Sequence, residues 1–99
     1  MSATVVRYQA KADRADENQS LIEKVFGDLE ARQPDGFTYK VFRLEDGVSF
    51  VHVVIEHDDV VNPDSLQDVP AFQAFVKDIA DRCDVAPVAM GATIVGGYR

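Results

Sequence analysis

Residues 37–56 read FTYKVFRLEDGVSFVHVVIE, and this stretch decides the fold. β-branched and aromatic residues fill both sides of Asp46-Gly47, a dipeptide that favours a two-residue hairpin loop because both of its positions accept positive φ. The pattern predicts two antiparallel strands, Phe37–Leu44 and Val48–Glu56, joined by that tight turn.

The predicted register sorts the side chains of this hairpin onto two faces. If Glu45 faces Val48, the pairs on one face are Tyr39 with Val54, Val41 with His52 and Arg43 with Phe50, because side chains alternate along a strand. The second strand of the hairpin is apolar on both faces. We therefore expect it to be a central strand with something packed on each side.

A strand and a helix are predicted before the hairpin. Thr4–Ala10 is rich in β-branched and aromatic residues, which is typical of a strand. From Asp16 onward, apolar residues recur at three- and four-residue spacings, and this period predicts an amphipathic helix that ends before Pro34.

The chain after the hairpin repeats the order of helix and strand. His57–Asp68 is acidic and predicts a loop with room for one helical turn. A second helix begins near Pro70, whose fixed φ suits the first helical position. We expect Pro87 to close the connection and Val88–Tyr98 to form the last strand. The apolar stripe of this second helix comprises Phe72, Phe75, Val76, Ile79 and Cys83. The residues expected to mark a bulge or a close backbone approach in the last strand are Gly91, Gly96 and Gly97.

The order strand, helix, strand, strand, helix, strand is the plan of the ferredoxin-like α+β fold, with a four-stranded antiparallel sheet and both helices on one face. We expect one such domain over residues 1–99, since the length suits a single core. The apolar face away from the helices then needs a cover. A second subunit's sheet is the simplest one, and we expect a homodimer.

Composition excludes several classes of partner. The net charge is −7, so the protein's field repels nucleic acid and anionic membrane surfaces. Cys83 is the only cysteine, so no intramolecular disulfide can form. The first residues run straight into a strand pattern without the features of a signal peptide, and we expect a cytoplasmic protein.

The strand and helix order, the doubly apolar third strand and the closing sequence ATIVGGYR at residues 92–99 together resemble the dimeric α/β-barrel superfamily. Within it the chain is most similar to the antibiotic biosynthesis monooxygenase group, over nearly its whole length. The resemblance implies two sheets packed into a barrel, with a small pocket between each sheet and its helices. It also implies a function in the range of cofactor-independent oxygenases of aromatic compounds, haem-degrading enzymes and muconolactone isomerases.

One departure from the group bears on the site. Its oxygenases and haem-degrading members typically use a tryptophan with a neighbouring asparagine, and this chain has no tryptophan. The two asparagines, Asn18 and Asn62, fall at the start of the first predicted helix and in the loop after the hairpin. No catalytic residue of the group is carried over.

Candidate site residues therefore come from the predicted sheet itself. His52 lies in mid-strand, where a near-neutral base can meet a ligand, and Tyr39 on the same face can donate a phenolic hydrogen bond; these two are the candidate catalytic residues. Tyr8, Arg43 and Phe50 are the candidate ligand-binding residues. The alternatives are a core histidine bonded to a neighbour, tyrosines that only pack, and a solvated arginine at the hairpin end.

Metal and cofactor sites are not predicted. His57-Asp58-Asp59 has the right residue types for a metal, but adjacent loop residues without a further cluster make a weak site. The expected chemistry needs no cofactor: a base removes a proton from a small, apolar aromatic ligand, and the carbanion reacts with oxygen directly. The alternatives are a non-catalytic module that binds a small molecule or dimerises, and an isomerase that works without oxygen.

Overall fold

The hairpin forms with the predicted register, in a computed structural model that describes residues 2–98. Tyr39 pairs with Val54 and Arg43 with Phe50, as the alternation of side chains required. The turn itself is longer than predicted. Leu44 already bonds Ser49 across the strands, and the amide of Gly47 closes a turn onto the carbonyl of Leu44 at 3.0 Å, so the loop has four residues instead of two.

The elements follow the predicted order and are joined by short 3₁₀ turns at residues 12–14, 66–68 and 79–82. They are β1 (Ser2–Ala10), α1 (Ala15–Arg32), β2 (Phe37–Arg43), β3 (Ser49–Glu56), α2 (Pro70–Val76) and β4 (Cys83–Thr93).

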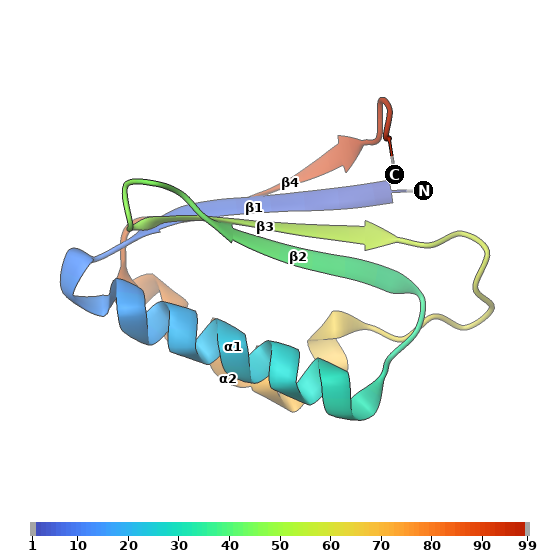
Figure 1. Cartoon of the computed structure of the whole chain (residues 1–99), viewed down its shortest axis with the longest axis horizontal. Helices are drawn as coiled ribbons and strands as arrows, with labels where there is room; N and C mark the ends of the chain where they lie inside the picture. Colours follow the sequence, from blue (N-terminus) through green and yellow to red (C-terminus); the bar gives the residue numbers. More distant parts are fainter. Residues whose placement is uncertain (1, 99) are drawn as a thin grey trace.

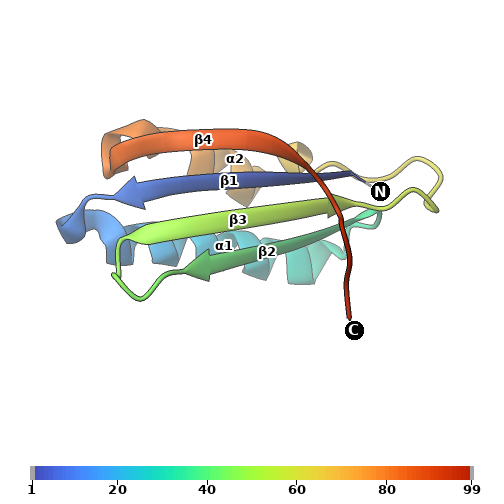
Figure 2. The ribbon, with the colours of Figure 1, turned by 90° about the horizontal axis from the view of Figure 1, so that it is seen from above.

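The four strands make one antiparallel sheet in the order β2-β3-β1-β4, with α1 and α2 on the same face (Figure 1). This is the predicted ferredoxin-like α+β fold, and β3 is a central strand as expected. The opposite face of the sheet is open, and the chain after β4 runs across the sheet on that open side (Figure 2). No helix among residues 2–98 is long and apolar enough to cross a membrane.

The second helix is shorter than its apolar stripe predicted. It ends at Val76, because Lys77 is extended and Asp78 adopts a left-handed conformation with φ +62°, which breaks the helical hydrogen bonds. A 3₁₀ turn follows, and Cys83 is the first residue of β4 instead of the last of a helical stripe. The spacing of these apolar residues fits a helix, but a left-handed aspartate interrupts it.

The last strand starts earlier than predicted and contains a bulge. Arg7 of β1 pairs with Val88 and Gln9 pairs with Val85, so the single residue Tyr8 lies opposite two residues of β4. One of these is Pro87, which has no amide hydrogen to donate and is tolerated at such a position in an edge strand. The prediction that Pro87 closes the connection was therefore wrong, and the bulge does not lie at a glycine. The strand also ends at Thr93 instead of Tyr98, so Gly96 and Gly97 lie outside it. The bulge itself places Pro87 beside the cavity described next.

Candidate functional site

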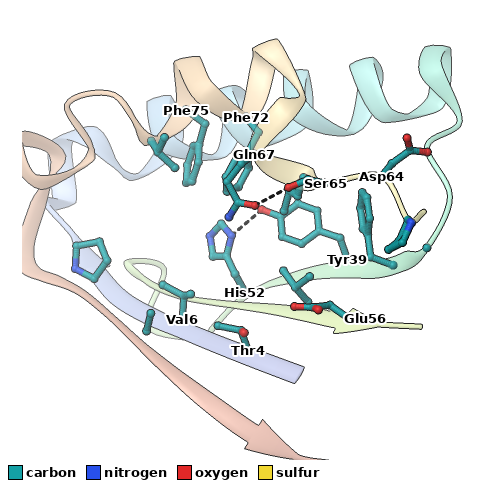
Figure 3. Close-up of a pocket in the computed structure, with 18 of the residues that line it drawn as sticks. Thr4, Val6, Tyr39, His52, Glu56, Asp64, Ser65, Gln67, Phe72 and Phe75 are labelled. Atoms are coloured by element: carbon teal, nitrogen blue, oxygen red, sulfur yellow. Dashed lines mark hydrogen bonds between the residues drawn. The ribbon is translucent and has the colours of Figure 1, made fainter. Parts of the chain in front are cut away.

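A cavity of about 520 Å³ lies between the inner face of the sheet and α2 with the loop that precedes it (Figure 3). Its walls are mostly apolar. The side chains from the sheet are Thr4, Val6, Tyr8, Phe37, Tyr39, His52, Val54, Glu56, Pro87 and Ala89; those from α2 and its flanks are Leu66, Phe72, Phe75, Val76 and Ile79. A cavity of this size and lining suits a small, largely apolar ligand.

Three polar side chains from adjacent strands meet on the sheet side of this cavity. His52 is on β3, between Tyr8 of β1 and Tyr39 of β2. Figure 3 shows the contact between His52 and Tyr39. Nε2 of His52 lies 2.8 Å from the hydroxyl of Tyr8, and Nδ1 lies 2.7 Å from the hydroxyl of Tyr39. Because strand side chains alternate, the register that pairs His52 with Val6 and Val41 puts all three rings on one face.

The row continues away from the cavity through two further buried side chains. Nδ2 of Asn18, on α1, donates to the hydroxyl of Tyr8 at 2.8 Å. Nε of Arg82, just before β4, donates to Oδ1 of Asn18 at 3.2 Å. The same guanidinium also donates to the carbonyls of Phe75 and Lys77 at the end of α2. We call the series Arg82, Asn18, Tyr8, His52 and Tyr39 the polar row.

Burial sets the protonation of the row. It lowers the pKa of His52 from 6.5 to about 4, so the imidazole is neutral at pH 7. Burial also raises the pKa of the Tyr8 and Tyr39 hydroxyls well above their usual range, and both stay protonated. At neutral pH the row therefore exchanges hydrogen bonds between neutral groups, with a cation only at its Arg82 end.

Aromatic rings enclose the row from the helix side. The Phe75 ring stacks on His52 with centroids 5.3 Å apart, and Phe72 meets the Tyr39 ring edge-on at 6.1 Å. Phe26 of α1 stacks on the other side of Tyr39 at 5.1 Å. Flat rings held this way favour a flat aromatic ligand by stacking and edge contacts.

The loop end of the cavity is more polar. Glu56, Asp64, Ser65 and Gln67 lie there (Figure 3). His57 is nearby, and its Nε2 lies 2.8 Å from the hydroxyl of Thr38. Among residues 2–98, no three His, Cys, Asp or Glu side chains are placed to hold one metal ion.

The structure brings together three of the five predicted site residues. Tyr8, Tyr39 and His52 line the cavity. Phe50 is buried under Tyr8, with ring centroids 5.5 Å apart, and is not part of the cavity lining. Arg43 lies outside the lining too: it donates to the carbonyl of Gly47 and to side chains of α1 at the far end of the hairpin.

Sequence reasoning missed Asn18 and Arg82. One signal was available for Asn18, because it lies four residues before Ile22 and seven before Val25, on the buried stripe of α1. A polar residue on such a stripe needs a buried partner. Nothing in the sequence pattern indicated that this partner system includes Arg82, which is 64 residues away.

Known structures resemble this one along nearly its whole length, although no protein-family model and no curated protein matches the sequence. Rv0793 from Mycobacterium tuberculosis aligns with a TM-score of 0.74 at 13% identity, covering 99% of this chain and 98% of that one. An antibiotic biosynthesis monooxygenase aligns at 0.72 and 18%, covering 97% and 100%. A point mutant of SnoaB, a cofactor-independent oxygenase from Streptomyces nogalater, aligns at 0.66 and 17%, covering 97% and 94%.

These identities are low, and the likeness establishes the fold. The chain has the fold of the antibiotic biosynthesis monooxygenase-like proteins, as the sequence resemblance predicted.

Proposed function

We propose that this chain, which has the fold of the antibiotic biosynthesis monooxygenase-like proteins, binds a small flat aromatic compound in the 520 Å³ cavity and oxidises it with molecular oxygen without a cofactor. The observation that carries the proposal is the buried contact between Tyr39 and His52 at 2.7 Å, on one side of a mostly apolar cavity whose lining includes the rings of Phe37, Phe72 and Phe75. The similarity to SnoaB supports the oxygenase class.

The proposed substrate is an anthrone or quinol, whose acidic C–H or O–H proton lies in conjugation with an oxygen. Loss of that proton to water leaves an enolate, and Tyr39 stabilises its oxygen by a hydrogen bond. For an anthrone, the enolate carbon gives an electron to O₂, the resulting radical pair forms a C–O bond, and the peroxide anion takes a proton from water to give a hydroperoxide. The hydroperoxide then loses water, so that one oxygen atom becomes the new quinone carbonyl and the other leaves as water.

His52 acts through Tyr39 in this proposal. Both of its ring nitrogens are occupied by tyrosine hydroxyls, at 2.8 and 2.7 Å, and its lowered pKa makes it a weak base. Tyr39 therefore touches the substrate, and His52 holds its hydroxyl in place.

Oxygen uptake with a panel of hydroxylated anthrones and quinols tests the proposal. We expect the wild-type protein to consume one O₂ per anthrone converted, and Tyr39→Phe to lower kcat roughly 100-fold because one donor to the enolate oxygen is lost. Ser20→Ala, which removes a hydroxyl from an exposed position of α1, is the control and leaves the rate unchanged. Uptake no faster than in buffer for every compound would refute the oxygenase.

A binding module is the second candidate. It is favoured by the neutral state of His52, because the buried part of the row offers no strong base to take a proton. In that case the same compounds would bind in the cavity, and neither oxygen uptake nor product would be seen.

We further propose that the protein is a homodimer and that it is cytoplasmic; the single cysteine supports the location. The open face of the sheet supports the dimer. Two rows of paired side chains cross it, mostly apolar but with one cation each: Phe42, Val51, Arg7 and Val88, and then Lys40, Val53, Val5 and Met90. Phe42 is 50% exposed and Met90 66% exposed, which leaves apolar area that a second sheet would cover.

Native mass spectrometry measures the subunit number directly. We expect twice the chain mass for the wild-type protein and a shift to the single-chain mass for Met90→Glu, because a charge in the middle of an apolar interface is costly to bury. Glu23→Gln, on an exposed position of α1 and away from the open face, is the control and stays dimeric. A wild-type monomer at micromolar concentration would contradict the dimer.

A further inference from the structure

Each hydrogen bond of the polar row has a defined donor and a defined acceptor, and Arg82 at one end determines which is which. We call this order the direction of the row. A guanidinium only donates hydrogen bonds, so the group of Asn18 that faces Nε of Arg82 at 3.2 Å must be the carbonyl oxygen. The amide nitrogen of Asn18 therefore faces the hydroxyl of Tyr8, to which it donates at 2.8 Å. An amide nitrogen cannot accept, so the oxygen of Tyr8 is the acceptor in that contact.

The hydroxyl proton of Tyr8 must be donated to a different neighbour. Tyr8 is 3% exposed, and a buried hydroxyl proton without an acceptor costs about 1–3 kcal/mol. The acceptor within reach is Nε2 of His52 at 2.8 Å. Because a neutral imidazole carries a single proton, that proton is then on Nδ1, which donates to the oxygen of Tyr39.

Tyr39 is the last residue of the row, and its hydroxyl proton is not donated to any other member of the row. Its oxygen accepts from Nδ1 of His52, and no acceptor for its own O–H lies within hydrogen-bond distance in the part of the chain that the structure describes. The hydroxyl lines the cavity, where a ligand can accept from it (Figure 3). With the proton of His52 on Nε2 instead, the hydroxyl proton of Tyr8 would have no acceptor. Tyr8 is more deeply buried than Tyr39, so this arrangement costs more.

We propose that Asn18 and Arg82 are positioning residues that make the cavity a hydrogen-bond donor, so that it selects aromatic ligands bearing an acceptor oxygen, such as a carbonyl or an enolate, over ligands of the same shape bearing only an N–H donor. This rests on the proposed binding of an aromatic ligand. The direction of the row is nevertheless a property of the protein alone, and it can be measured without any ligand.

A single isosteric change reverses the row. In Asn18→Asp the new carboxylate still accepts from Arg82, but it offers Tyr8 an acceptor where the amide offered a donor. Tyr8 then gives its proton to residue 18, accepts from Nε2–H of His52, and leaves Nδ1 to accept the proton of Tyr39. The cavity loses its donor without losing any side chain that lines it.

Long-range ¹⁵N–¹H spectra of His52 at pH 7 test this. We expect a protonated Nδ1 and a bare Nε2 in the wild-type protein, and the reverse in Asn18→Asp. Asn62→Asp adds the same charge in the loop after β3 and keeps the wild-type pattern. A protonated Nε2 in the wild-type protein would overturn the proposal even if Asn18→Asp did not fold, as would a folded Asn18→Asp with the wild-type tautomer.

Ligand preference is the second readout, with three flat tricyclic probes of similar shape. Fluorenone presents a carbonyl, carbazole an N–H, and fluorene neither. We expect fluorenone to bind the wild-type protein roughly five- to tenfold more tightly than fluorene, the worth of one hydrogen bond. Asn18→Asp removes that advantage and favours carbazole, whereas equal affinity of all three for the wild type would refute the selection. Neither the tautomer of His52 nor the ligand preference depends on oxygen uptake. A failure of the proposed oxidation can therefore be distinguished from a failure of the proposed ligand selection.

Discussion

Replacing Arg82 by leucine is expected to destabilise the protein by about 3 kcal/mol or more. Arg82 is 3% exposed and donates to Asn18 and to the carbonyls of Phe75 and Lys77. Leucine fills part of the space but leaves these three acceptors buried or half-buried without a donor. The guanidinium of Arg82 also lies over the Phe75 ring, 5.3 Å from the centroid, and that contact is lost too.

Urea unfolding followed by circular dichroism measures this loss. The expected loss is a large part of the free energy of unfolding, which is typically about 5–15 kcal/mol for a domain. The control is Arg32→Leu, which removes an arginine whose side chain is 53% exposed and whose ion pair with Asp28 spans one helical turn. Such a pair contributes less than about 1 kcal/mol. If both variants lost similar, small amounts, Arg82 would not hold the end of the row.

Acidification is expected to weaken the fold through His52. Its pKa is about 4 in the folded protein, against the ordinary 6.5. Between these two values the unfolded chain binds a proton that the folded one does not, so stability rises with pH across this window and is lost as pH falls. The stabilising contribution is fully present above pH 6.5, and its loss by pH 4 is about 3 kcal/mol. His52 is 4% exposed, so solvent does little to stabilise its charged form in the folded protein.

Unfolding free energies at pH 7, 6, 5 and 4.5 separate this effect from the titration of surface carboxylates. His52→Gln has no imidazole to protonate, and its stability should fall less steeply than that of the wild type. Equal slopes for the wild type and His52→Gln would show that His52 is not held neutral by burial.

Much of the sheet could be predicted from the hairpin sequence. The alternation of side chains along residues 37–56 determined which residues share a face, and Tyr39 and His52 were placed together for that reason. The register survived an error in the turn, since lengthening the loop by one residue on each side leaves all other pairs unchanged. Local patterns of this kind need no information from distant residues.

The end of the chain was harder to predict because its signals compete. The spacing of Phe72, Phe75, Val76, Ile79 and Cys83 fits a helix throughout. The helix nevertheless stops when Lys77 extends and Asp78 turns left-handed, and β4 begins at Cys83. A proline inside an edge strand is tolerated at a bulge or where its amide position faces solvent, and which of these applies depends on the pairing with the partner strand.

Only the part of the candidate site that lies within the sheet could be predicted, because it depends on local alternation. Tyr8, Tyr39 and His52 share a face by strand alternation, which the sequence shows. Asn18 and Arg82 join them only because α1 and the 3₁₀ turn before β4 meet in the folded chain, which brings residues 64 positions apart into contact.

The tautomer of His52 in the wild-type protein tests the central claim most directly, since the donor at Tyr39 depends on it. In a long-range ¹⁵N–¹H spectrum at pH 7 we expect the proton on Nδ1, bonded to Tyr39, with Nε2 accepting from Tyr8. A proton on Nε2 would contradict this. Tyr39 would then donate its hydroxyl proton to Nδ1 of His52, and the row would offer no donor to a ligand oxygen in the cavity.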